Sequence, residues 1–257
     1  MIFLFSLSLV LLNFAQAKSS LIDQQIIVPA GKFQPFFKET NDKNEIYIEA
    51  FSINKYPVTN DEFNSFLKNN SKFSKSKILK IYADQRYLMD WKNDLLTTDE
   101  LKKNGRKPVT NVSWFVAKKY CQSVGMRLPT IYEWEYASDS TNPEILKELL
   151  VWYSQTGEHE IVDVGSGKPN KFGIHDMHGV IWEWVEDFSS VMISSDSRSK
   201  GDRTDGFFCG GGSVSSLDSK AYATFMRYGF RSGLKGDYCM KSLGFRCVKD
   251  ILKSGVK

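Results

Sequence analysis

The chain of 257 residues is poor in proline and histidine, with 7 and 3 of these residues. It also lacks a strong excess of one charge, because 34 Lys and Arg stand against 30 Asp and Glu and the two kinds are interleaved. A phosphate backbone requires a dense basic surface, so nucleic acid is not an expected partner. The 42% of hydrophobic and 14% of aromatic residues exclude a disordered or collagen-like chain. These figures predict a globular protein.

Long apolar runs are absent after the first segment of the chain. Residues 1–17 are mostly apolar and end in Ala15-Gln16-Ala17, the small-x-small pattern that signal peptidase cleaves. We therefore predict a signal peptide at 1–17, an exported protein that is periplasmic or secreted, and a single domain at 18–257. A membrane-anchored product is the alternative, since the segment has no Lys or Arg before its apolar run. Charged residues interrupt the later apolar runs, so no membrane span is expected in the mature chain.

Cysteine is scarce and never arranged as C-x-x-C, which argues against a zinc site made of thiolates. Export places the chain in an oxidising compartment, where an even number of cysteines predicts disulfides. Spacing alone allows three connectivities among the four. The cysteines are Cys121, Cys209, Cys239 and Cys247.

Helix-capping patterns recur along the first two thirds of the chain. A Thr or Ser before apolar residues at helical spacing predicts a helix start, and Glu three residues later strengthens it at Thr59, Thr130 and Thr141. The expected helices begin after Thr59, near Thr98 with an end at Gly105, after Ser113 with a stop at Gly125, after Thr130, and after Thr141.

Strand patterns are short and scattered. Residues 26–33 predict a strand, a Pro-Ala-Gly turn and a return strand, and residues 46–53 predict one half-buried strand. Beyond Leu150 the chain is rich in Gly, Ser and aromatic residues, so we expect loops and brief strands up to a final strand at 243–248. The fold class is therefore α+β with much irregular structure.

Six collinear motifs resemble those of the formylglycine-generating enzyme (sulfatase-modifying factor) domain family. They are SINKYPVTNDEF, PVTNVSW with YC, RLPTIYEWEYAS, FGIHDMHGVIWEWVEDF, GGSV and SLGFRC. The resemblance covers the chain from about Ile26 to Val248 and implies one domain with that family's variant of the C-type lectin fold.

The resemblance also shows what is missing. The family oxidises a cysteine in a C-x-P-x-R peptide to formylglycine, with oxygen and a copper ion held by two cysteines. Ser216 occupies the first position, three residues beyond the Ser213 of the GGS motif, and no cysteine occurs between Ser213 and Tyr238. A serine hydroxyl is neither soft nor ionised near neutral pH, so it is a poor ligand for Cu(I). We expect no formylglycine formation.

The motifs also resemble those of an exported branch of the family that is associated with nitrite reductases. This suggests a protein that binds a peptide or small ligand and assists the maturation of a secreted redox or copper protein. The alternative is a metal-dependent oxidase of the formylglycine-generating or non-haem iron or copper type. By resemblance, Cys121 pairs with Cys247, which leaves Cys209 and Cys239 to pair with each other.

The family's calcium site corresponds here to two carboxylates and two backbone carbonyls. Hard oxygen ligands on a turn suit Ca²⁺, and the alternative is a carboxylate pair that caps turns. The four positions are Asp176, Gly179, Ile181 and Glu183.

A second candidate metal site consists of His175 and His178, whose spacing would suit copper or iron if Asp176 or Glu186 lay nearby as a further ligand. Structural histidines are the alternative. The family's substrate groove corresponds to Trp182, Ser213, Ser216 and Arg231. Core packing is the alternative for Trp182, and an ion pair with an acidic residue at the surface is the alternative for Arg231.

Overall fold

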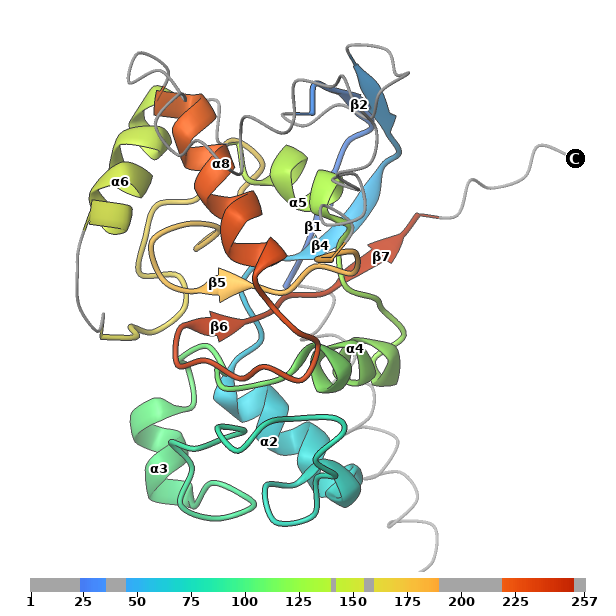
Figure 1. Ribbon diagram of the computed structural model, residues 1–257, viewed down its shortest axis with the longest axis vertical. Coiled ribbons are helices and arrows are strands. Elements are labelled where there is room, and N and C mark those ends of the chain that lie inside the picture. The colour runs from blue at the N-terminus through green and yellow to red at the C-terminus, as the bar shows by residue number, and fades with distance from the viewer. Residues whose placement is uncertain (1–23, 36–44, 140–141, 155–159, 190–218, 252–257) are drawn as a thin grey trace, which may run out of the picture.

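Helices and short strands are joined by long irregular segments in the computed structural model of the protein (Figure 1). The predicted α+β class is confirmed. The described residues are 24–35, 45–139, 142–154, 160–189 and 219–251.

The main sheet has three antiparallel strands in the order β1 (Gln25–Val28), β4 (Phe51–Asn54) and β7 (Val248–Asp250). All four residues of the central strand β4 are buried. The sheet therefore joins two strands near the start of the sequence to one strand near its end.

The predicted hairpin at 26–33 is wrong, because its return strand pairs elsewhere. That strand, β2 (Gly31–Phe33), pairs with β3 (Ile46–Ile48) in a second, two-stranded sheet. The single strand expected at 46–53 is likewise two strands, β3 and β4. The fully buried β4 needs partners on both edges, which β1 and β7 provide, whereas β3 is only partly buried.

The helix starts agree with the capping patterns. Thr59, Thr97 and Thr130 each form a complete capping box, and the Ser113 hydroxyl accepts from the N–H of Val116. The helices are α2 (Asn60–Asn69), the 3-10 turn η1 (Ser71–Phe73), α3 (Thr98–Asn104), α4 (Trp114–Ser123), α5 (Ile131–Ala137) and α6 (Pro143–Ser154).

The cap predicted for α6 lies partly outside the described residues, since Thr141 is not among them. Within the described residues, the side chain of Asn142 caps the first turn, because its Oδ1 accepts from the N–H of Glu144 at 3.0 Å.

The largest departure from expectation is α8 (Ser219–Ser232), a helix of 14 residues where only loops and brief strands were expected. Its buried positions include Ala223, Arg227 and Arg231, which recur every four residues. Two of these three are arginines, so a search for apolar periodicity does not detect the buried face. α8 packs against α6 and crosses in front of the centre of the molecule in Figure 1.

The predicted final strand at 243–248 is also divided. β6 (Leu243–Gly244) pairs in parallel with β5 (Trp182–Glu183), and β7 begins only at Val248. Arg246, in the break between them, is fully buried and bonds to Glu183.

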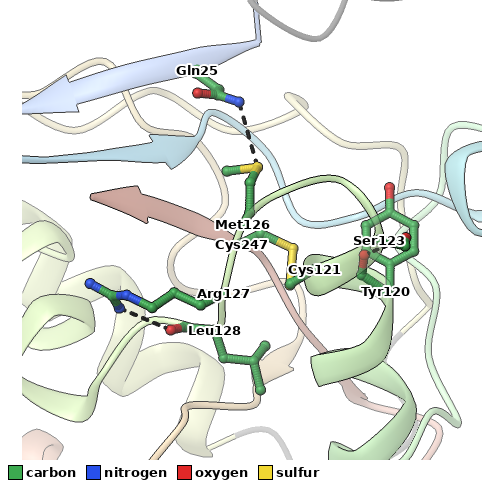
Figure 2. Close-up of a disulfide and its surroundings, with 8 residues drawn as sticks. All are labelled: Gln25, Tyr120, Cys121, Ser123, Met126, Arg127, Leu128 and Cys247. Carbon is green, nitrogen blue, oxygen red and sulfur yellow. Dashed lines mark hydrogen bonds between the residues drawn. A yellow bond between two sulfur atoms is a disulfide. The ribbon is translucent and has the colours of Figure 1, made fainter. Parts of the chain in front are cut away.

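A disulfide joins α4 to the residue before β7. Cys121 and Cys247 are 1.99 Å apart at their sulfur atoms and 126 residues apart in sequence, as the resemblance predicted (Figure 2). Beside it, Arg127 and Val248 exchange backbone hydrogen bonds of 2.9 and 2.7 Å.

Among the described residues, no helix is both long and apolar enough to cross a bilayer.

Candidate functional site

Two arginines from α8 converge on one buried carboxylate of α5. Arg227 donates from Nε and Nη2 to Glu135 at 2.8 and 2.6 Å, and Arg231 donates from Nη1 at 3.1 Å. The three residues are between 1 and 4% exposed. Two positive charges therefore share one negative charge in a setting that excludes water.

The pKa of Glu135 depends on its burial and on the two guanidinium groups bonded to it. Burial alone raises the pKa of the Glu135 carboxyl, but the two guanidinium groups outweigh burial and lower the pKa below its ordinary value. Glu135 is therefore ionised at neutral pH. Nearby, burial raises the pKa of Asp187, and Arg231 works in the opposite direction.

His178 lies against the same cluster. Its ring packs edge-on against Trp134, with the centroids 5.5 Å apart. Burial and the positive charge of Arg227 lower the pKa of His178 to about 3, so its imidazole is neutral at physiological pH. Its Nε2 atom is buried and has no hydrogen-bond partner among the described residues.

Trp134 connects this cluster to a second buried ion pair. Arg231 lies over its ring at 4.4 Å from the centroid, and its indole N–H donates to Oε2 of Glu183 at 2.7 Å. Glu183 also accepts from Nε and Nη2 of Arg246 at 2.8 and 2.8 Å. One indole thus contacts an arginine through its face and a glutamate through its edge.

An aromatic group built around Trp182 lies alongside the charged cluster. Trp182 stacks on Phe230 of α8, with centroids 4.2 Å apart, and on Tyr153 of α6, with the rings 6° from parallel and 5.3 Å apart. Trp152 is a third neighbour at 5.0 Å. Trp182 is half-buried, whereas the next residue, Glu183, is fully buried. The strand therefore turns one side chain toward the aromatic group and the next into the core.

Two of the four groove residues predicted from sequence lie in the described part of the chain. Trp182 and Arg231 contact this site from β5 and α8, and Arg231 forms an ion pair with a buried acid rather than a surface one. Ser213, Ser216 and Cys209 lie outside the described residues.

The described thiols are not placed for metal chemistry. Cys121 is in the disulfide with Cys247, and Cys239 is buried with no disulfide partner among the described residues. Burial raises the pKa of the Cys239 thiol, which keeps it protonated at neutral pH.

The predicted calcium ligands are not free to converge. Both oxygens of Glu183 are bonded to Arg246, which already neutralises that carboxylate. Asp176 accepts the N–H of Gly165 through Oδ2 at 2.6 Å, and its buried Oδ1 has no partner among the described residues. As arranged, this donor set does not fit Ca²⁺, because the ion would have to displace a guanidinium. Calcium binding stays a prediction.

The two histidines proposed as copper or iron ligands have different neighbours. Nδ1 of His175 lies 2.9 Å from the carbonyl of Gly167 and its ring lies near Tyr56, whereas His178 packs on Trp134. The described part of the chain contains no group of three or more His, Cys, Asp or Glu side chains that could hold a metal ion. The geometry gives the two histidines no further ligand there.

Sequence reasoning missed the residues that define the site. Glu135, Arg227 and Trp134 were not among the candidate residues. The available signal was that Arg227 and Arg231 stand four apart in a segment of aromatic residues, the spacing of one helix face.

Comparison with known proteins agrees with the motifs. Residues 12–251 match the family described as "Sulfatase-modifying factor enzyme 1-like domain". The chain is 25% identical over 284 residues to the formylglycine-generating enzyme of Bos taurus, covering 89% of this chain and 75% of that protein. It is 23% identical over 269 residues to the "Inactive C-alpha-formylglycine-generating enzyme 2" of Bos taurus, covering 86% of each.

A further relative is the "Serine/threonine-protein kinase pkn1" of Chlamydia caviae, 29% identical over 182 residues. That match covers 65% of this chain but only 28% of the kinase. Among solved structures, CarF has a TM-score of 0.47 at 18% identity, covering 88% of this chain and 98% of CarF. PvdO from Pseudomonas aeruginosa has a TM-score of 0.46 at 17% identity, covering 88% and 94%. With 240 consecutive positions (12 to 251) matched by the family profile, the chain belongs to the sulfatase-modifying factor enzyme 1-like domain family.

Proposed function

We propose that this chain is an exported member of the family that binds a peptide or small ligand and does not generate formylglycine. It would serve as an accessory in the maturation of a secreted redox or copper protein. The observation that carries the proposal is the absence of any cysteine from Ser213 to Tyr238, where the family holds its copper ligands.

The described cysteines support this view. Cys121 and Cys247 are consumed by the disulfide, and Cys239 is buried and protonated. A relative whose printed name calls it inactive is similar over 86% of this chain. The fold and the loss of formylglycine chemistry are therefore compatible in one protein.

The candidate site favours a ligand with an anionic group beside an apolar one. Arg227 and Arg231 already hold the carboxylate of Glu135, and guanidinium groups bind carboxylates through paired N–H donors. Trp182 and Phe230 offer stacked aromatic surface next to them. A peptide carboxylate next to an apolar side chain combines these features.

The test is an activity assay and a binding assay on the same preparation of residues 18–257. The protein is given copper, oxygen and a C-x-P-x-R peptide, with the Bos taurus formylglycine-generating enzyme as positive control. We expect no mass loss in the peptide by mass spectrometry. Conversion of the cysteine above a no-enzyme control would refute the proposal.

The binding assay follows tryptophan fluorescence with the same peptide, in forms with a free and an amidated C-terminus. We expect the free carboxylate to bind more tightly, and Trp182→Leu to weaken binding while circular dichroism stays unchanged. Equal affinity for the two forms would refute the proposal that the ligand binds through an anionic group.

The rival oxidase is tested by metal analysis of the purified protein. Copper or iron in stoichiometric amount, lost on His178→Ala and on His175→Ala, would favour the oxidase. We expect neither metal at stoichiometry, because the two histidines have different neighbours and no third described ligand.

A further inference from the structure

A second site lies at the other end of the molecule, between α2, α3 and the segment that precedes α4. It is a pocket of about 450 Å³, and none of its lining residues belongs to the charged or aromatic cluster described above. This volume is within the range of small-molecule sites. In Figure 1, α2 and α3 are at the bottom of the molecule, away from α5, α6 and α8.

Asn111 is the polar side chain that marks this pocket. It is buried, lines the pocket, and donates from Nδ2 to Oδ2 of Asp90 at 2.7 Å. A carboxylate only accepts at neutral pH, so this bond fixes the amide with its nitrogen toward Asp90. The remaining atom, Oδ1, is buried and has no hydrogen-bond partner among the described residues. A buried acceptor without a partner is costly and calls for a donor.

The backbone around Asn111 is held in an unusual conformation. Asn111 has φ 54° and Leu88 has φ 45°, and the N–H of Leu88 donates to the carbonyl of Asn111 at 2.9 Å. Asn tolerates this left-handed region, but a leucine there is strained. Leu88 also lines the pocket. Strained residues that support each other beside a pocket are characteristic of ligand sites.

The charges of the lining favour a cation. Three lining residues are acidic and two are basic, which leaves a formal excess of one negative charge. Asp90 is the acid that bonds to the Asn111 side chain, and it is exposed to solvent. The acidic residues are Asp90, Glu100 and Glu160, and the basic ones are Lys107 and Lys241.

We propose that this pocket binds a primary ammonium group on a short alkyl chain, with one N–H donating to Oδ1 of Asn111 and the charge compensated by Asp90. The apolar lining residues Leu88, Trp91 and Leu96 accommodate the alkyl chain. A bare metal ion fits less well, because the described residues include no group of three or more ligating side chains. The ammonium could belong to a free amine or to a lysine side chain of a partner protein, which carry the same chemistry.

The experiment is isothermal titration of residues 18–257 with three probes. Putrescine represents a free amine, N-acetyl-lysine amide represents a lysine side chain, and butanol is the uncharged control. We expect one or both amines to bind and butanol not to bind. Preference for putrescine identifies a free amine as the ligand, and preference for the lysine derivative identifies a protein side chain.

Two variants locate the binding. Asn111→Gly removes the carboxamide and keeps a residue that accepts a positive φ. Asp90→Asn removes the charge, and Asp94→Asn is its matched control, because Asp94 is on the same segment but bonds to Ser76 and does not line the pocket. Loss of a hydrogen bond to a charged group corresponds to about a tenfold weaker affinity or more, so we expect this for Asn111→Gly and Asp90→Asn, with no change for Asp94→Asn.

Failure of both amines to bind to the wild-type protein would overturn the proposal. Binding that is unchanged in Asn111→Gly, or reduced equally by Asp90→Asn and Asp94→Asn, would overturn it as well. Circular dichroism of each variant separates a local effect from unfolding. The peptide-binding assay on Trp182→Leu is independent of these outcomes, because the two sites share no described residue.

Discussion

The indole N–H of Trp134 donates to the carboxylate of Glu183 at 2.7 Å. The same ring lies under the guanidinium of Arg231, which is bonded to Glu135. Two buried carboxylates, 48 residues apart in sequence (135 and 183), are thereby linked through one side chain. The interior is held by charge as well as by apolar packing, and this leads to predictions that an ordinary hydrophobic core would not give.

Trp134→Phe should destabilise the protein by about 1 to 3 kcal/mol, because it keeps an aromatic ring but removes the donor to a buried carboxylate. Urea unfolding measures the change. Trp114→Phe is the control, since its N–H donates to a neutral acceptor, the carbonyl of Val185 at 3.0 Å. Equal losses in the two variants would show that the charge of Glu183 is unimportant.

Loss of Glu135 should be more harmful than loss of Arg231. Glu135→Gln removes the carboxylate to which two buried guanidinium groups are bonded, which corresponds to about 3 to 5 kcal/mol. Arg231→Met leaves a balanced pair of Glu135 and Arg227, so we expect a smaller loss. Urea unfolding measures the loss of unfolding free energy in each variant. A larger loss in Arg231→Met than in Glu135→Gln would contradict the interpretation that both arginines depend on the one carboxylate.

Stability should decrease on acidification because of His178. Its pKa is about 3 in the folded protein against an ordinary value of 6.5, so the unfolded chain binds the additional proton between these values. Lowering the pH from 6.5 therefore favours unfolding, by at most about 1.4 kcal/mol per pH unit from this residue.

The comparison that isolates this effect is the difference in unfolding free energy between pH 7 and pH 5. His178→Gln should show a smaller difference than the wild type, because glutamine does not titrate. His175→Gln should keep the wild-type difference. A wild-type difference that persists in His178→Gln would assign the pH dependence to other groups.

Reduction of the Cys121–Cys247 disulfide should lower the melting temperature clearly, because a bridge across 126 residues removes about 4 to 5 kcal/mol of unfolded-chain entropy. Differential scanning calorimetry with and without reductant measures it, and Cys121→Ala should reproduce the effect without reductant. Peptide mapping under non-reducing conditions checks the remaining pairing. A peptide linking Cys209 to Cys239 would confirm that prediction, and a free thiol at Cys239 would refute it.

The sequence was sufficient where structure is determined locally. Capping boxes at Thr59 and Thr130 are complete within four residues, so the starts of α2 and α5 could be predicted. The pairing of Cys121 with Cys247 was predicted from the family resemblance and not from the spacing of the cysteines.

Features that depend on distant partners could not be predicted in this way. β2 pairs with β3 rather than β1, and nothing within 26–33 specifies that choice. The helix α8 was missed because its buried face carries Arg227 and Arg231, which bond to Glu135 of the distant helix α5. The pocket at Asn111 depends on a φ angle and an unpartnered oxygen, neither of which is visible in sequence.

The position of β7 has a consequence for biosynthesis. Strand β4 is the centre of the main sheet, but one of its edges is covered only by residues 248–250. The ribosome makes these residues almost two hundred positions after β4, so the emerging chain has an uncovered strand edge for most of its synthesis. The disulfide cannot form before then either, since it needs Cys247. We therefore expect the domain to complete its folding only after translation has passed residue 250, with a requirement until then for factors that keep the open edge from aggregating.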